Sequence, residues 1–369
     1  MRRLLLASAL LLTGLAPGQA ADYFFYSGTY TDGTSKGIYG WRFNDTSDSM
    51  TPLGLVAATP QPAHIWITPN GKFLYTVNWL KEGAVSAYAI DHHSGKLTFL
   101  NTVSAHGASP NQVVVDPSGK IAVTVNYNSG TLAAYRIGAD GRLSEAFYTE
   151  HHDGKPLSPK QPGAKQHGVV FSADSKFMYI ADLGLDRIYS YHLDVNRPAI
   201  TAVEPPFVLT HAGAGPRRLQ LSPDGRFLYV NHETDSEVQV FAVHQGHLTP
   251  LQSLSTIPAG FKGNNSTAEI LVSADGRFVY VTNRGADSIA VFSADPKTGL
   301  LAPVENVPSG GKTPRNIRFG PHGRLLFVAN QGSGDITVFR VDAASGKLSP
   351  TGQVLAIDQP GGMYFVKAN

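Results

Sequence analysis

The sequence predicts an all-β fold: a seven-bladed β-propeller with four antiparallel strands in each blade, closed by N- and C-terminal strands that share one blade. Three observations predict it, namely a repeated phrase, the Gly-containing turns within it, and incomplete units at the two ends. The phrase occurs six times, beginning at Pro62, Pro110, Gln166, Pro216, Ala268 and Pro314. A spacing of roughly 50 residues is typical of one supersecondary unit repeated around an axis.

Each copy of the phrase predicts two strands joined by a tight turn. The copy PRRLQLSPDGRFLYVNH, from Pro216, has an alternating apolar segment, an Asp-Gly turn, and a second segment that ends near Asn. Asp-Gly supplies the positive φ that tight hairpins require. A third strand follows, such as Val238–Phe241, and a Gly-containing turn then leads to a fourth, as at Ser345–Leu348. Four strands of period-two patterning in each repeat are typical of a propeller blade.

The two ends of the chain predict how the ring closes. Tyr23–Tyr30, Gly37–Phe43 and Leu53–Ala57 form three strands of a blade that lacks its first strand, and Gly362–Val366 is a lone strand after the last full repeat. Together they complete a seventh blade and remove the exposed sheet edges that invite aggregation. An open β-solenoid is the alternative, which the length of the repeat and the split blade disfavour.

The N-terminus predicts export. Two arginines precede the apolar run Leu4–Leu15, and small residues follow at Gly18–Ala20. This pattern is typical of a secretory signal peptide, and about 12 apolar residues are too few for a membrane span; a single-span anchor is the lesser alternative. We therefore expect a signal peptide at 1–20, a single propeller domain at 21–369, and a periplasmic or secreted protein that does not span the membrane after cleavage.

Composition excludes several classes of partner and cofactor. The chain has no cysteine, which suits an exported protein and excludes disulfides, iron–sulfur clusters and thiolate zinc sites. The formal net charge is +2, and the basic residues are scattered rather than gathered in the stripe that nucleic-acid binding requires. We expect a monomer that binds a small molecule, with no nucleic-acid partner and no cofactor.

Propeller topology predicts that one end of the central channel carries the chemistry. The start of the first strand and the end of the second strand of each blade lie at the same end, and the Asp-Gly turns lie at the opposite end. The starts of the first strands carry His64, His167, Arg217, Glu269 and Arg315. The ends of the second strands carry Asn78, Asn126, Asp182, Glu233, Arg284 and Asn330. Convergent polar groups in a concavity predict a binding site, although the Asn side chains also fit a role as turn caps.

At these positions the chain resembles the lactonase family of seven-bladed propellers, which includes bacterial 6-phosphogluconolactonases and the fungal 3-carboxy-cis,cis-muconate lactonizing enzyme. The resemblance covers essentially the whole mature chain. It is carried by Gly28–Thr31 with Gly37–Tyr39, Val125–Tyr127, Ala181–Ile188, Gly213–Arg217, Asn283-Arg284 and Pro314-Arg315. Propellers of the YVTN type share the strand phrases, so the Gly-Ala-Gly-Pro-Arg run and the charged residues in the blades that follow it are the more specific part.

The resemblance implies site residues by position. The catalytic candidates are His167, Arg217, Glu233 and Arg284, and the substrate-binding candidates are Arg315, Glu269, Asn126, Asp182, Arg218 and His232. Three residues depart from the family pattern. Arg218 stands where the family usually has His, His232 where it usually has Asn, and Gln166 lies in what is often a Pro-His-x-His run. The site is recognisable but altered.

These residue types suit lactone hydrolysis. A His or a Glu can activate water, so either His167 or Glu233 is the candidate base. Arginine is always charged and can stabilise an oxyanion or bind an anionic substrate group. The alternative is that Glu233 and Glu269 form purely structural ion pairs with Arg217 and Arg284, since such networks also perturb pKa values.

The functional expectation is hydrolysis of a sugar-type lactone by a metal-independent, 6-phosphogluconolactonase-like hydrolase of carbohydrate metabolism. We expect no metal at the candidate site because its arginines repel a cation. Two alternatives stay open: a lactone-forming cycloisomerase, and a non-catalytic YVTN-type binding propeller. A phosphorylated sugar lactone is a cytoplasmic metabolite, whereas an exported enzyme would act on an unphosphorylated lactone such as an aldonolactone.

Overall fold

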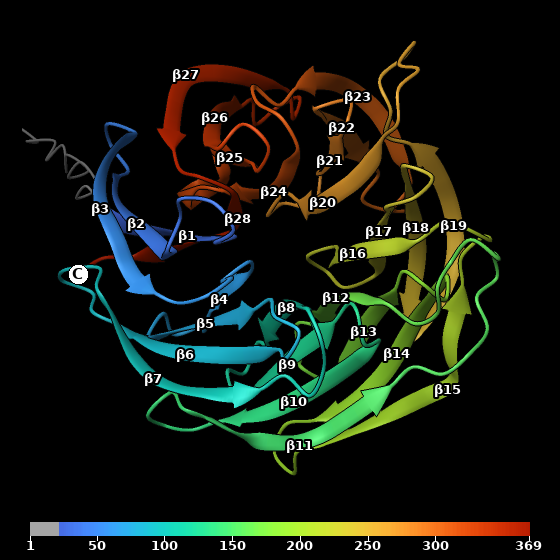
Figure 1. Cartoon of the computed structure of the whole chain (residues 1–369). Coiled ribbons are helices and arrows are strands. Elements are labelled where there is room, and N and C mark those ends of the chain that lie inside the picture. The colour runs from blue at the N-terminus through green and yellow to red at the C-terminus, as the bar shows by residue number, and fades with distance from the viewer. Residues whose placement is uncertain (1–21) are drawn as a thin grey trace, which may run out of the picture.

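The computed structural model describes residues 22–369 and forms a ring of seven four-stranded antiparallel sheets (Figure 1). The predicted signal peptide at 1–20 lies outside the described residues. Within the described part of the chain, the structure contains no helix that is long and apolar enough to cross a membrane. The fold predicted from the sequence is therefore confirmed, including the number of blades and of strands in each blade.

The strands are as follows, from the channel outward in each blade. Blade 1 consists of β28 (Pro360–Lys367), β1 (Asp22–Thr29), β2 (Gly37–Asn44) and β3 (Ser49–Ala58). Blade 2 consists of β4 (Ile65–Ile67), β5 (Phe73–Asn78), β6 (Ala84–Ile90) and β7 (Leu97–Ser104). Blade 3 consists of β8 (Pro110–Val115), β9 (Ile121–Asn126), β10 (Thr131–Ile137) and β11 (Leu143–His151). Blade 4 consists of β12 (Gln166–Phe171), β13 (Phe177–Asp182), β14 (Arg187–Asp194) and β15 (Ala199–Leu209).

The remaining blades continue the ring. Blade 5 consists of β16 (Pro216–Leu221), β17 (Phe227–His232), β18 (Glu237–His244) and β19 (His247–Ser255). Blade 6 consists of β20 (Ser266–Val272), β21 (Phe278–Arg284), β22 (Ser288–Ala294) and β23 (Leu301–Pro308). Blade 7 consists of β24 (Pro314–Phe319), β25 (Leu325–Asn330), β26 (Asp335–Val341) and β27 (Leu348–Ala356), with the 3₁₀ turn η1 (Pro321–Gly323) between β24 and β25.

Blade 1 closes the ring as the two chain ends predict. Strand β1 pairs antiparallel with β28, with Tyr26 opposite Tyr364, so the beginning and the end of the described chain lie side by side (Figure 1). This pairing joins the two terminal strands and gives blade 1 the same four strands as the other six blades.

The core consists of apolar layers between neighbouring blades. The second strand of a blade is covered on both faces, which is why β17 is buried at all six positions and begins with the apolar run Phe227–Val230. The outermost strand β19 has no fully buried residue, and its sequence is a mixture of polar and apolar residues. Phe227 and Tyr229 of blade 5 pack with Ile270 and Val279 of blade 6 in one such layer.

The repeated turn between the first two strands has one recurring geometry. In blade 5, Ser222 Oγ donates to Asp224 Oδ1 (2.6 Å) and accepts from Phe227 N (3.0 Å), and Gly225 has a φ of 71°. The left-handed conformation requires a residue such as Gly, which has no Cβ to clash. The same bonds recur in blade 6 from Ser273 to Asp275. This turn is therefore fixed locally, in agreement with the Asp-Gly signal in the sequence.

Candidate functional site

Four of the sequence-predicted residues meet at one end of the central channel. The carboxylate oxygen Oε2 of Glu233 lies 2.6 Å from Arg217 Nε, 3.1 Å from Arg284 Nη2 and 3.8 Å from His167 Nε2. We call these four residues the rim cluster. They come from three consecutive blades: His167 from β12, Arg217 and Glu233 from the start of β16 and the residue after β17, and Arg284 from the end of β21.

Backbone irregularities aim these side chains inward. The pairing of the first two strands slips between Gln166 and Gly168 in blade 4 and between Pro216 and Arg218 in blade 5. The residues left unpaired by the slips are His167 and Arg217. A β-bulge re-aims a side chain relative to the regular pleat. Bulges at the same position leave Asn111 and Arg315 unpaired in blades 3 and 7.

The rim cluster is buried except at its carboxylate. The exposed fraction of the side chain is 2% for Arg217, 4% for His167 and 15% for Arg284, but 25% for Glu233. Arg217 also donates through Nη1 to the carbonyl of Ala268. The arginines are thus held by the protein, and the end of Glu233 remains open to the rim.

His167 is held as a neutral imidazole. Burial, reinforced by the nearby charges of Arg217 and Arg218, lowers its pKa well below the usual value of 6.5. Asn111 Nδ2 donates to His167 Nδ1 at 2.7 Å, so the ring proton resides on Nε2, which faces Glu233. This proton placement favours Glu233 over His167 as the proton acceptor.

The charges around Glu233 keep it ionised. Burial raises the pKa of its carboxyl, but Arg217 and Arg284 more than offset that effect, and the net pKa lies below its usual value. In return, burial and the neighbouring Arg217 lower the pKa of Arg284 to about 10. Both groups are therefore charged at neutral pH, and the concentration of guanidinium groups disfavours a cation beside Glu233.

A second charged pair lies deeper in the channel. Arg218 Nε is 3.7 Å from Glu269 Oε2, and Asn316 Nδ2 donates to the same oxygen at 2.6 Å. Arg218 also donates to the carbonyl of His167 at 3.3 Å. The cavities lined by these groups are only about 10 Å³ and 30 Å³, which is room for about one water molecule. Arg218 and Glu269 therefore support the rim cluster from below.

Aromatic side chains that the sequence analysis did not single out as site residues border the rim cluster. The Tyr127 ring meets His167 edge-on at 5.6 Å between centroids, and Lys165 Nζ lies 4.4 Å from the Tyr127 centroid. Arg315 Nε donates to the hydroxyl of Tyr30 at 2.8 Å. Asn111 was also missed. Its position in the repeat could have identified it, because Pro110-Asn111 occupies the same position as Pro216-Arg217.

Of the six predicted substrate-binding residues, none belongs to the rim cluster itself, and Asn126, Asp182 and His232 also lie outside the groups described above. Asn126 is fully buried and donates to the carbonyl of Ala105 (2.8 Å) and to Thr131 Oγ1 (2.9 Å). Asp182 is fully buried too, accepts from the amide of Lys165 (2.9 Å) and contacts His152 Nδ1 (2.9 Å). Both side chains bond to the segments that enter their blades, away from the rim cluster.

The third of these residues, His232, lies in a different group. Its ligand atom and those of His211, Asp235 and Glu237 all lie within 4.8 Å of one another. We call these four residues the outer cluster. Imidazoles and carboxylates in one group are potential metal ligands, a feature that the sequence analysis did not anticipate.

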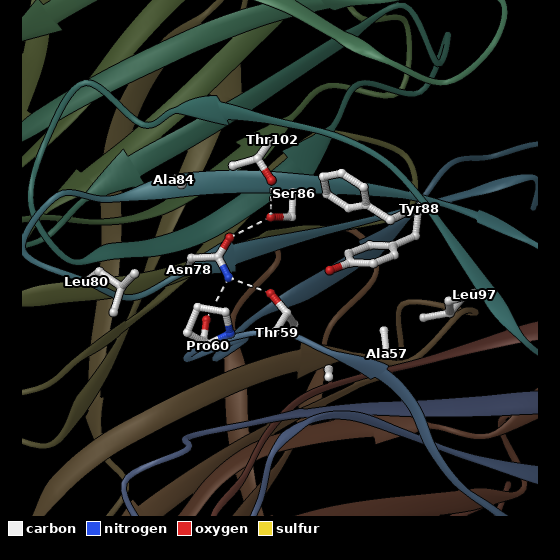
Figure 2. A pocket seen from close by; sticks show the side chains of 12 residues that line it. Ala57, Thr59, Pro60, Asn78, Leu80, Ala84, Ser86, Tyr88, Leu97 and Thr102 are labelled. Carbon is white, nitrogen blue, oxygen red and sulfur yellow. Dashed lines mark hydrogen bonds between the residues drawn. The ribbon is translucent and has the colours of Figure 1, made fainter.

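The structure also has a larger cavity away from the channel rim. It has a volume of about 490 Å³, is lined by residues of blades 1 and 2, and is shown in Figure 2. Asn78 is part of its lining, donating to Thr59 Oγ1 (2.9 Å) and accepting from Ser86 Oγ (2.7 Å). Its lining includes no carboxylate, histidine or arginine. Because it lacks groups for proton transfer at neutral pH, we place the candidate active site at the rim cluster instead.

Comparison with known proteins agrees with the fold and indicates a chemistry. The family described as "Lactonase, 7-bladed beta-propeller" matches residues 24–365. A 6-phosphogluconolactonase of Bacillus subtilis (strain 168) is 35% identical over 309 residues, covering 81% of this chain and 85% of the relative. A 6-phosphogluconolactonase of Formosa agariphila is 30% identical over 308 residues, covering 80% and 86%.

Solved structures give the same picture. The periplasmic gluconolactonase PpgL of Pseudomonas aeruginosa superimposes with a TM-score of 0.89 at 34% identity, covering 95% of this chain and 100% of that chain. A putative 6-phosphogluconolactonase of Bacteroides fragilis superimposes with a TM-score of 0.88 at 32% identity, covering 94% and 98%.

Proposed function

Because the chain belongs to the lactonase family of seven-bladed β-propellers, we propose that it hydrolyses a sugar lactone at the rim cluster. The observation that supports this most directly is the open carboxylate of Glu233, held between the buried Arg217, the partly exposed Arg284 and a neutral histidine. A carboxylate beside fixed positive charges can move a proton while the charges stabilise the oxyanion that forms.

In the proposed reaction, Glu233 is the proton carrier. Its carboxylate takes a proton from the attacking water as the new C–O bond forms at the lactone carbonyl. The tetrahedral oxyanion then collapses, the ring C–O bond breaks, and the leaving alkoxide takes the proton back from Glu233. The product is an open-chain hydroxy acid, which ionises at neutral pH.

The other members of the rim cluster have distinct proposed roles. Arg284, the more exposed of the two arginines, faces the developing oxyanion, and Arg217 holds Glu233 from beneath through its 2.6 Å contact. His167 directs its Nε2 proton toward Glu233 and acts as a positioning residue. Arg315, with Tyr30 against it, supplies a further cation for substrate oxygens. We propose no metal in this step, because the guanidinium groups occupy the place that a cation would need.

The proposed substrate is an unphosphorylated sugar lactone outside the cytoplasm. The similar protein PpgL is a periplasmic gluconolactonase, and the N-terminal sequence of this chain fits a signal peptide. The name of the Bacillus relative points instead to a phosphorylated lactone. The two substrates differ by a phosphate group, so a direct comparison of their turnover distinguishes them.

The test is acid release by the purified mature protein, measured in a pH-stat with gluconolactone, its 6-phosphate and a simple aliphatic lactone. We expect catalysis of the sugar lactones and a fall of about 10²–10⁴-fold in kcat for Glu233→Gln, which removes the proton acceptor. Glu145, exposed on β11, is the matched control, and Glu145→Gln should hydrolyse at the wild-type rate. A chelator should leave kcat unchanged.

Two results would contradict the proposal. Wild-type protein that leaves every lactone at the uncatalysed rate would point to a non-catalytic binding propeller. Full turnover by Glu233→Gln would move the active site away from the rim cluster.

A further inference from the structure

His232 of the outer cluster can be compared with the residue at the same position in the other blades. This position lies near the end of the second strand, seven residues after the Gly of the hairpin turn, or after Ser175 in blade 4. Four blades have Asn and one has Asp, namely Asn78, Asn126, Asn283, Asn330 and Asp182. Blade 5 has His232. A change of residue type at a repeated structural position needs a reason particular to that blade.

In the other blades this residue completes a local bond network. The Nδ2 atoms of Asn78, Asn126 and Asn283 donate to the carbonyls of Pro60 (2.6 Å), Ala105 (2.8 Å) and Thr256 (2.8 Å) respectively, each in the segment that enters the blade. His232 makes no such bond. It is fully buried, and its Nε2 has no hydrogen-bond partner among the described residues. A buried imidazole nitrogen without a partner is costly unless something binds it.

The residues around His232 are those that bind divalent metals. Its Nδ1 lies 3.4 Å from Asp235 Oδ2, which His211 Nε2 also contacts. The centroids of the His211 and His232 rings are 5.5 Å apart, and the rings meet edge-on at an angle of 65°. Glu237 supplies a second carboxylate in the group. Two imidazoles and two carboxylates match the N and O ligands of Zn²⁺, and the two carboxylates balance the charge of a 2+ ion.

A histidine–carboxylate pair in the neighbouring blade shows what a purely structural pair looks like. His152 Nδ1 contacts Asp182 at 2.9 Å, and its Nε2 contacts the Tyr191 hydroxyl at 2.9 Å, with the His152 and Asp182 side chains fully buried. Both ring nitrogens are therefore used. In the outer cluster, by contrast, His232 has a free nitrogen and the His211 side chain is 49% exposed, which leaves a route of entry from solvent.

The cluster also joins two segments that a metal could tie together. His211 lies in the loop between β15 and β16, and Asp235 lies in the turn between β17 and β18. The two segments already touch through Glu233 N, which donates to the carbonyl of Gly215 at 2.7 Å. Ligands around one Zn²⁺ ion lie about 3–4 Å apart, and the ligand atoms of this group already lie within 4.8 Å of one another, so small side-chain rotations would close the site.

We propose that His211, His232, Asp235 and Glu237 form a binding site for a divalent transition metal, with Zn²⁺ as the best match. The site goes beyond the proposed hydrolysis, since it is separate from the rim cluster and takes no part in the reaction. A metal with four protein ligands clamps the loop that enters blade 5 to the turn after β17, and it stabilises the folded state because it binds only when both segments are in place.

The test is metal binding by the full mature protein, so its result is independent of lactone turnover. Chelator-stripped protein is titrated with Zn²⁺ by calorimetry, and its metal content is measured after dialysis. We expect one equivalent of Zn²⁺ and a raised Tm. Both effects should be lost in His232→Asn, which restores the residue type that four other blades have and should therefore fold.

A second variant and a control complete the test. His211→Ala changes an exposed side chain in a loop and should also lose Zn²⁺. His151→Ala is the matched control, because His151 is another half-exposed histidine with a carboxylate neighbour, Asp153, at 3.1 Å; it should keep the full equivalent. No stoichiometric binding by the wild type, or equal binding by His232→Asn, His211→Ala and the wild type, would overturn the proposal.

Discussion

The turn after β9 and the turn after β17 enter the left-handed region at the same position but differ in side-chain chemistry. Four residues beyond the end of each strand the chain enters the left-handed region, with a φ of 62° at Gly130 and 61° at Ser236. In the first turn, the residues at the end of the strand are Asn126 and Tyr127, and the side-chain amide of Asn126 donates to the carbonyl of Ala105. In the second they are His232 and Glu233, which belong to the outer cluster and the rim cluster.

This difference shows how a repeated fold acquires a site. The hairpin register and the left-handed residue set the shape of the turn, so two side chains per blade can change without altering the backbone. Most blades use the first of them to close the blade. In blade 5 the two positions hold His232 and Glu233, whose side chains contact residues of other segments. In blade 6 the position equivalent to Glu233 holds Arg284.

The largest effect expected from these comparisons is on kcat, and it tests whether the position of Glu233 and Arg284 takes part in the reaction. Arg284→Met should lower kcat for a sugar lactone by about 10²–10³-fold, because it removes a charge that stabilises the oxyanion. Arg277→Met is the control, since Arg277 is an exposed arginine on the turn at the opposite end of blade 6. Steady-state kinetics measure both variants. A wild-type kcat in Arg284→Met would contradict the proposal that this position contributes to the reaction.

A smaller effect tests the structural role of the first position. Asn126→Ala should lower the free energy of unfolding by about 1–3 kcal/mol, because the carbonyl of Ala105 loses a buried donor. The folded variant should keep its kcat. Denaturant unfolding and lactone kinetics on the same sample measure the two quantities. A variant of unchanged stability that has lost lactone turnover would instead place Asn126 in the active site.

The smallest effect concerns the response of stability to acid. The pKa of His167 is held below 6.5 by burial and by Arg217, so the unfolded chain binds a proton that the folded chain resists. Stability should therefore fall as the pH drops below about 6.5, by at most about 1.4 kcal/mol per pH unit for this residue. Denaturant unfolding at pH 7 and pH 5.5 measures the loss.

Two variants isolate the contribution of His167 to that loss. His167→Gln should reduce the difference in unfolding free energy between the two pH values, whereas His244→Gln, at an exposed position on β18, should not. Part of the loss should persist in His167→Gln, since burial lowers the pKa of His64 as well. An unchanged difference in His167→Gln would mean that this histidine is not held neutral by the fold.

The candidate site was only partly predictable from the sequence. The repeat indicated which end of the channel collects the polar residues, and the resemblance selected His167, Arg217, Glu233 and Arg284, which the structure brings together. The roles of other residues depended on partners far away in the chain. Asn126 and Asp182 have the residue types of a binding site, but their bonds go to the backbone and to blade closure.

The sequence by itself determined the propeller, because each hairpin is specified by residues close together in the chain, namely alternating apolar segments and a turn with Gly in the left-handed conformation. The two chain ends add the parts of one more blade, three strands at the start and one at the end. Only the tertiary structure decided what each polar residue does. The bulges that turn His167 and Arg217 inward arise where strands pair, and both the carboxylate of Glu233 and the imidazole of His232 obtain their neighbours from loops and blades that meet only when the ring closes.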